Sequence, residues 1–337
     1  RKATHRAMAN PNLLETVSAE PVEPATGSEA KKVQGKSPGR IALERLRRDK
    51  IAMVCAGIVL FFILIGALAG PITTLTKTDP YQLNSDLIDM YGYPTIGFTA
   101  EHPFGLDTKL GRDLFSRWLY GAQISLIVAI SAAVLSTIIG TTLGMLAGFL
   151  GGWVDRAVSW LVHFFLSLPF LLVAMSVAPV VDSYFPTNGG TDQSNMRLVV
   201  LVAVLTMFGW TSLARLIRGE VLSLREREFI QAARAIGVPT RRVLFRELLP
   251  NLTGPLIVSL SLAVPSFVAA EAGLSFLNVG VAEPTPSWGR TIADATNYYD
   301  TYPSYLWIPV LSIILLVLSL NLLGDAVRDA FDPKTRR

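Results

Sequence analysis

The sequence predicts an all-α integral membrane protein with about six transmembrane helices, and three observations support this prediction. Of the 337 residues, 51% are hydrophobic and 17% are charged, which is more apolar than a soluble core of this length requires. The apolar residues form uncharged blocks of roughly 18 residues or more, enough to cross the hydrocarbon layer of a membrane. Arg and Lys are concentrated in only some of the connecting segments, as is typical of cytoplasmic loops.

Six blocks have the length of a membrane span. The uncharged run 118–154 is too long for one span at about 1.5 Å per residue, so we place its membrane helix at 122–149. The third and fifth blocks each contain one ionisable residue, His163 and Glu271. The predicted spans are 51–70, 122–149, 157–181, 198–214, 255–279 and 305–324.

The basic residues indicate how the spans are oriented. They are dense at 40–50, before the first span, at 218–246, between the fourth and fifth spans, and at 334–337. The 71–121 segment instead has four basic residues against six acidic ones. Because positive charge marks the cytoplasmic side, we expect both termini and the 218–251 loop to be cytoplasmic and the 71–121 segment to be external.

The chain divides into four parts. Residues 1–39 are rich in Ala, Pro, Glu and Lys and poor in large apolar residues, so we expect a disordered cytoplasmic tail. Residues 40–121 hold the first span and the external segment. Residues 122–326 form the core domain, which carries the cytoplasmic loop 218–251, and residues 327–337 form a cytoplasmic C-terminal tail.

Sequence context excludes several functions. The formal charge of +4 follows the membrane topology without interleaved exposed aromatic residues, so we expect no nucleic-acid partner. The single cysteine, Cys55, lies in the first span and allows neither an internal disulfide nor a cysteine metal site. Residues 30–37 fit a loosened phosphate-loop pattern, but no apolar strand precedes them and Pro38 follows, so we expect no nucleotide binding. Neither Gly-x-Ser-x-Gly nor His-Glu-x-x-His occurs, so we expect no enzymatic activity.

The 218–251 loop is too regular to be a simple connector. It predicts a short helix that ends at Gly237, which tolerates the left-handed conformation of a helix cap, and a second helix that starts at Pro239. The first helix has one small apolar face at i, i+3, i+4 and i+7, formed by Phe229, Ala232, Ala233 and Ile236. Such a helix could lie on lipid. We favour docking to another protein, because an alanine-rich face buries little surface in lipid but permits close approach.

This loop resembles the Glu-Ala-Ala loop of binding-protein-dependent ABC importers. The resemblance rests on Gln231-Ala232-Ala233, Gly237 and Leu249-Pro250 at their spacings. Gln231 replaces the usual Glu of that loop, and Glu247 replaces its usual Ile. In that family the loop is the coupling helix, which sits in a groove on the ATPase and transmits its closure to the membrane helices. The resemblance therefore implies a coupling role for Phe229, Gln231, Ala232, Ala233, Ile236, Gly237, Leu249 and Pro250.

Further motifs are similar to those of the second, C-type permease subunit of the dipeptide, oligopeptide and nickel importer family. They are His102-Pro103-Phe104-Gly105-Leu106-Asp107, Gly111-Arg112-Asp113, Ser275-Phe276-Leu277, Pro284-Thr285-Pro286-Ser287-Trp288-Gly289 and Gly324-Asp325-Ala326-Val327-Arg328-Asp329. In the third span, Trp160 and His163 occupy positions where the family usually has Arg and Asp. We expect Pro284, Pro286 and Trp288 to face the external binding protein.

The resemblance implies a type I ABC importer permease fold in the bacterial cytoplasmic (inner) membrane and a non-catalytic transport subunit. Such a subunit forms half of the translocation pathway with a second, related permease as a heterodimer. Two cytoplasmic ATPase domains bind the ATP and Mg, and an extracytoplasmic binding protein delivers the solute, so no cofactor is expected on this chain. Dipeptides or oligopeptides are the expected cargo, and nickel complexes or another small solute are the alternative.

Two other classes fit the sequence less well. A secondary transporter would usually show more spans, internal repeats and several membrane carboxylates. A membrane sensor or scaffold would not require the alanine-faced helix between the fourth and fifth spans.

Some residues inside the predicted spans have roles that remain open. Glu271 is the only carboxylate well inside a span, so we expect it to face either the pathway or a helix interface. His163 has the same two alternatives, and packing or hydrogen bonding is favoured. Gly140, Gly144 and Gly148 recur at every fourth residue, which favours close helix packing over a hinge.

Overall fold

The computed structural model describes residues 38–184 and 191–331, and within them every regular element is a helix. The predicted disordered tail lies outside the described residues up to position 37, as do residues 332–337 of the predicted C-terminal tail. The first elements are α1 (Pro38–Arg48), α2 (Lys50–Ala67), α3 (Ala69–Thr76), η1 (Ser85–Leu87), α4 (Leu114–Leu150), α5 (Gly152–Ser167), α6 (Phe170–Tyr184) and α7 (Thr191–Arg225). The others are α8 (Glu228–Ala235), α9 (Thr240–Arg242), η2 (Val243–Leu248), α10 (Leu249–Asn251), α11 (Thr253–Phe276), α12 (Trp288–Ala295) and α13 (Pro303–Phe331).

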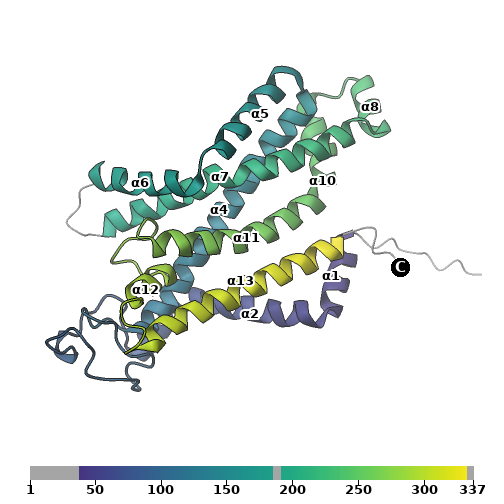
Figure 1. Cartoon of the computed structure of the whole chain (residues 1–337). Helices are drawn as coiled ribbons and strands as arrows, with labels where there is room; N and C mark the ends of the chain where they lie inside the picture. The colour runs from purple at the N-terminus through teal and green to yellow at the C-terminus, as the bar shows by residue number, and fades with distance from the viewer. Residues whose placement is uncertain (1–37, 185–190, 332–337) are drawn as a thin grey trace, which may run out of the picture. The chain divides into compact units, whose positions relative to one another are not determined.

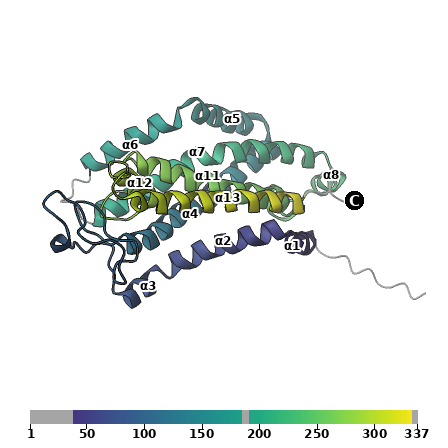
Figure 2. The same cartoon turned by 60° about the horizontal axis from the view of Figure 1, so that its bottom comes forward.

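Five helices are long and apolar enough to cross a membrane. They are α2, α4, the Ser194–Arg225 part of α7, α11 and α13, and they contain most of five of the six predicted spans. Figure 1 shows them running alongside one another. The helices α1 and α8 lie at one end of this bundle, while α12 and the 77–113 segment lie at the opposite end, as Figure 2 also shows. The segments predicted to be cytoplasmic therefore share one end of the bundle, and those predicted to be external share the other.

The third predicted span, 157–181, is not one straight helix. It is divided between α5 and α6, which meet at an angle of 82°. The bend falls at Leu168, whose backbone is extended, immediately before Pro169. Proline disfavours the helical conformation in the residue before it, which accounts for the break. With this bent pair counted as one span, the bundle has up to six.

Two helices extend beyond their predicted spans. Helix α4 has 37 residues, so at about 1.5 Å per residue it is longer than the hydrocarbon layer is thick. Asp113 caps its start by accepting a hydrogen bond from the Ser116 N–H, and Gly151, with a φ of 66°, follows its end. Helix α7 continues to Arg225, so the first part of the predicted 218–251 loop is helical.

The glycine pattern in α4 is a packing feature, as predicted. A β-carbon at Gly140, Gly144 or Gly148 would lie 2.8, 2.7 or 2.9 Å from a carbonyl oxygen of α7. The three oxygens belong to Trp210, Ala214 and Arg218, which are also four residues apart. The two helices therefore pack backbone against backbone, a contact that only glycine permits.

Candidate functional site

Helix α8 is fixed to the end of the bundle by one buried side chain. Ile230 is fully buried in a cluster with Ile217 and Val221 of α7 and Val243 and Leu248 of η2. Its neighbours on the helix, Gln231 and Ala232, are exposed. Ile230 is therefore the one fully buried side chain among residues 228–235, and most of the helix surface is exposed.

The face of α8 that points outward differs from the predicted one. Phe229, Ala232 and Ile236 are exposed, and Ile236 is 80% exposed. Ala233 is only partly exposed and packs against the cluster around Ile230. Since residue 230 lies about 60° around the helix from residue 233 at 100° per residue, burial of Ile230 rotates Ala233 toward the chain. The exposed apolar face is thus made by three of the four predicted residues.

The predicted helix stop at Gly237 is confirmed. Gly237 has a φ of 77°, the left-handed region in which glycine is unstrained. Its N–H donates to the carbonyl oxygen of Arg234 at 3.0 Å, and the Val238 N–H donates to that of Ala233 at 3.0 Å. These two hydrogen bonds form a Schellman motif, which satisfies the last carbonyl groups of α8. Pro239 follows in an extended conformation and caps α9 instead of occupying its first turn.

Two further contacts connect this region to α4. The Arg234 guanidinium lies over the ring of Phe149, 5.5 Å from its centre, in a cation–π arrangement. Arg225 at the end of α7 donates to the carbonyl oxygen of Gly148 at 3.5 Å. Helix α8 is therefore in contact with both α7, through Ile230, and α4, through Arg234.

The end of the loop contains a change of helix type. The element η2 is a π-helical turn, and Leu249 and Pro250 follow it at the start of α10. Proline has no N–H to donate, so an unbroken α-helical ladder cannot pass through Pro250. The Asn251 side chain donates to the carbonyl oxygen of Glu247 at 2.6 Å. Leu249 packs against the Ile230 cluster, whereas Pro250 is exposed.

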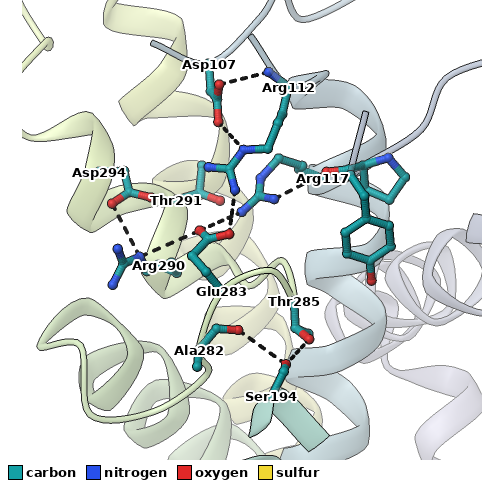
Figure 3. A network of polar contacts seen from close by, with 12 residues as sticks. Asp107, Arg112, Arg117, Ser194, Ala282, Glu283, Thr285, Arg290, Thr291 and Asp294 are labelled. Carbon is teal, nitrogen blue, oxygen red and sulfur yellow. Dashed lines mark hydrogen bonds and ion pairs between the residues drawn. The ribbon is translucent and has the colours of Figure 1, made fainter. Parts of the chain in front are cut away.

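At the opposite end, two of the sequence motifs are joined by a network of ions. Arg112 donates from Nε to Asp107 at 2.6 Å and from Nη1 to Glu283 at 2.5 Å. Arg117, which is 2% exposed, donates to the other oxygen of Glu283 at 3.1 Å and to the carbonyl oxygen of Pro80 at 3.3 Å. Figure 3 shows the Glu283 carboxylate joined to both arginine side chains. This carboxylate therefore holds the 101–113 segment against the loop that follows α11.

The charge state of Arg112 follows from its surroundings. Burial alone would lower the pKa of Arg112, but Asp107 and Glu283 outweigh it and raise the pKa above the ordinary value. The guanidinium therefore stays charged, and removal of either carboxylate would leave a buried charge without its partner.

The prediction that Trp288 faces a binding protein is wrong. Trp288 is fully buried, and its indole N–H donates to the carbonyl oxygen of Trp118 at 2.9 Å. Its ring packs edge-on against Phe62, and Gly121 leaves room for it. Pro286 is also buried and Pro284 is partly exposed. A large aromatic side chain with a satisfied N–H suits a core position, so this motif stabilises the bundle from within.

Glu271 lies in a helix interface. It is fully buried and accepts hydrogen bonds from Ser125 of α4 at 2.6 Å and from Ser275, one turn further along α11, at 2.8 Å. Ser275 in turn accepts a hydrogen bond from the Val281 N–H at 3.1 Å. Of the two predicted roles, this geometry matches the helix interface.

His163 lies on the exposed side of α5. Its Nδ1 atom is 2.6 Å from the carbonyl oxygen of Ser159, one turn earlier in the same helix. Trp160, 65% exposed, stacks on Phe164 along the same helix. His163 is therefore not brought together with Glu271, and its role remains a prediction.

Comparison with known proteins connects both ends of the bundle to one family. A family described as binding-protein-dependent transport system inner membrane component matches residues 140–337. A second family model, the N-terminal TM domain of oligopeptide transport permease C, matches residues 37–90. The two matches together include α8, α12 and the first span.

Curated relatives match nearly the whole chain. The dipeptide transport system permease protein DppC of Alkalihalophilus pseudofirmus is 34% identical, covering 89% of this chain and 91% of that protein. The glutathione transport system permease protein GsiD of Salmonella paratyphi A is 37% identical, covering 90% and 93%. The oligopeptide transport system permease protein OppC of Bacillus subtilis is 31% identical, covering 93% and 96%.

A solved structure has a similar fold. A chain of the inward-facing methionine ABC transporter MetNI aligns with a TM-score of 0.50 and 19% identity. The alignment covers 65% of this chain and 98% of the matched chain. At this identity the likeness concerns the arrangement of helices alone.

Proposed function

Because this chain belongs to the family of binding-protein-dependent transport system inner membrane components, as a multi-pass membrane protein with a type I importer permease fold, we propose that it is the C-type permease subunit of an ATP-driven peptide importer. In this role the chain forms half of the translocation pathway. The hydrolysis of ATP takes place on separate ATPase subunits, which hold the ATP and Mg, and this chain binds no cofactor.

The observation that carries the peptide assignment is the extent of the match to the relatives. Identities of 31% to 37% run over about nine tenths of each chain, and the relatives are named for dipeptides, oligopeptides and glutathione. Glutathione is itself a tripeptide, so the three names share one chemistry. Nickel complexes, the alternative from the sequence, are not favoured by these names.

Energy enters through α8. The exposed face of Phe229, Ala232 and Ile236 docks in a groove of the ATPase, as the coupling helix does in related importers. Ile230 and the Arg234–Phe149 contact then transmit the movement to α7 and α4. Gln231, whose side chain donates to the carbonyl oxygen of Glu226 at 3.1 Å, and the Gly237 cap keep the helix short and rigid.

The pathway itself requires a second subunit. An open groove of about 700 Å³ between α4 and α7 is lined mainly by apolar side chains, such as Ile127, Leu135 and Val199. A peptide with charged termini needs polar walls, since an unpaired charge in an apolar environment costs several kcal/mol. The pathway therefore forms between this chain and a related permease, as a heterodimer, and an extracytoplasmic binding protein delivers the peptide.

Reconstitution tests the proposal. The chain, its partner permease, the ATPase subunits and the binding protein are placed in liposomes, and uptake of labelled di- and oligopeptides and of nickel is measured with and without ATP. We expect peptide uptake that depends on both ATP and the binding protein. Uptake of nickel without uptake of any peptide, or peptide uptake independent of ATP, would refute the proposal.

A further inference from the structure

A cavity of about 370 Å³ opens beside the ion network at the predicted external end of the bundle. Its walls come from the 108–112 segment, from the loop after α11 and from α12. The charged side chains that line it are those of Lys109, Arg112, Glu283, Arg290 and Asp294. Arg112 and Glu283 already form a close ion pair within the network. The residues left to bind a further group are therefore Lys109, Arg290 and Asp294.

Two of these cations, Arg290 and Lys109, are held less tightly than Arg112. The Arg290 Nε is buried and, within residues 38–184 and 191–331, donates to no acceptor. Its ion pairs are loose, since Nε lies 3.3 Å from an Asp294 oxygen and 3.8 Å from a Glu283 oxygen without hydrogen-bond alignment, and Nη1 donates to the Asn278 side chain. The exposed ammonium of Lys109 makes no ion pair in the same part of the chain. The Arg290 side chain is 25% exposed and its carboxylate contacts are loose, so a further acceptor entering the cavity can pair with it and with Lys109.

The charges around the cavity point to an anion. With Arg117 and Asp107 immediately behind the wall, four cations face three carboxylates. One additional carboxylate would balance them. A second additional carboxylate would make negative charge exceed positive charge, and Glu283 and Asp294 would repel it. The cavity therefore suits a single acidic group.

The surface beside the cavity has the character of a protein interface. The Lys109 N–H donates to the carbonyl oxygen of Gly92 at 2.7 Å, which holds the 89–93 turn next to this lysine. That turn presents Met90, 89% exposed, and Tyr91, 77% exposed. Leu110 on the cavity rim is 43% exposed. Exposed Met and aromatic side chains beside an arginine are typical of the central part of protein–protein interfaces.

We propose that this cavity receives one aspartate or glutamate side chain of the extracytoplasmic binding protein, which pairs with Arg290 and Lys109 while the 89–93 turn packs against the same protein. This proposal rests on the proposed function. It also replaces Trp288, which is buried, as the point of contact that the sequence suggested.

Titration with the binding protein tests how tightly the complex binds that protein. The complete complex is reconstituted, and ATP hydrolysis is measured against the concentration of binding protein. Arg290→Ala and Lys109→Ala should each raise the half-saturating concentration, by about tenfold for Arg290, because a charged hydrogen bond is lost. Hydrolysis without binding protein and the maximal rate should stay unchanged. Lys77→Ala, at another exposed external lysine with a left-handed backbone, should have no effect and serves as the control.

Zero-length cross-linking tests the chemistry of the partner group. A carbodiimide activates a carboxylate, and an amine within contact then displaces the urea to form an amide. We expect a cross-link between Lys109 and an acidic residue of the binding protein, identified by mass spectrometry. Lys109→Arg keeps the charge but lacks the reactive amine, so it should abolish the cross-link while the half-saturating concentration stays close to that of the wild type.

The results separate this proposal from the proposed function. Unchanged half-saturating concentrations in both alanine variants, or cross-links at Lys77 and none at Lys109, would overturn the cavity as the docking site. A lower maximal rate at unchanged half-saturation would also overturn it, because the cavity would then act on the transport cycle. Failure of the wild-type complex to respond to any binding protein would contradict the proposed function instead.

Discussion

Gly144 in α4 faces the backbone of Ala214 in α7 so closely that a β-carbon at position 144 would lie 2.7 Å from the Ala214 carbonyl oxygen. It would also lie 2.9 Å from the β-carbon of Ile217, which belongs to the cluster that buries Ile230. The closest packing between the two long helices is thus continuous with the cluster that fixes α8. Contacts therefore run without interruption from α8 through Ile230 and Ile217 to the α4–α7 seam.

Replacing Gly144 with leucine should separate α4 from α7. Overpacking of this kind lowers the free energy of unfolding by about 1–3 kcal/mol. Thermal unfolding of the purified chain in detergent measures the loss. Gly219→Leu is the matched control, since Gly219 lies on an exposed side of α7 with no atom within 4 Å of the added β-carbon. Equal losses in both variants would show that the loss at Gly144 does not come from its close contact with α7.

Glu271 should act by stabilising the interface of α11 with α4. Glu271→Leu leaves Ser125 and Ser275 without their acceptor, which we expect to lower the free energy of unfolding by about 1–3 kcal/mol. Glu271→Gln retains an acceptor oxygen and should lose less, with peptide uptake close to the wild type. If Glu271→Leu is as stable and as active as the wild type, both the interface and the pathway roles fail.

Loss of the Glu283 charge should release the external segment. Glu283→Gln leaves Arg112 and Arg117 largely buried without their shared counter-ion, and we expect a loss of about 1–3 kcal/mol, moderated because Glu283 is 33% exposed. Limited proteolysis should then cut the 77–113 segment faster. Glu226→Gln, where the carboxylate is 68% exposed and pairs with Arg225, should change neither measurement. Unchanged proteolysis in Glu283→Gln would contradict the role given to this carboxylate.

The orientation of the bundle stays a prediction and can be tested by labelling. In a Cys55→Ser background, Met90→Cys lies in the 89–93 turn and Arg241→Cys lies in α9, and both positions are exposed. A membrane-impermeant thiol reagent applied to intact cells should label position 90 alone, because basic loops stay in the cytoplasm. Labelling of position 241 would reverse the topology.

Much of the fold could be predicted because it depends on local patterns. Uncharged blocks of span length indicated the long helices, and four-residue glycine spacing indicated the seam that Gly144 occupies. The stop at Gly237 was visible in sequence because a left-handed cap needs glycine whatever surrounds it.

The parts that could not be predicted depend on contacts between distant residues. The outward face of α8 is set by Ile230, whose partners lie in α7 and η2. The Arg112–Glu283 pair joins residues 171 positions apart, so no local sequence pattern predicts it. Trp288 was expected outside because its motif is external, but the aromatic ring fills a gap that Gly121 leaves in α4. Pro169 was the available signal for the bend after α5.

The docking of α8 is tested by two substitutions that leave the membrane helices intact. Ala232→Trp places a bulky side chain on the exposed face, and Gly237→Val strains the left-handed cap by about 1–2 kcal/mol. Ala233→Trp is a poorer choice, because Ala233 packs against its own chain. Ala67→Trp, at an exposed position in the last turn of α2, is the control.

The central claim, that energy reaches this chain by contact at α8, is tested most directly by measuring ATP hydrolysis and peptide uptake together in liposomes that contain the complete complex. With Ala232→Trp or Gly237→Val, the partner permease should still co-purify, while substrate-stimulated hydrolysis and uptake fall together and the Ala67→Trp control keeps both. Normal hydrolysis and uptake in both variants, or ATP hydrolysis by this chain purified alone, would contradict the claim.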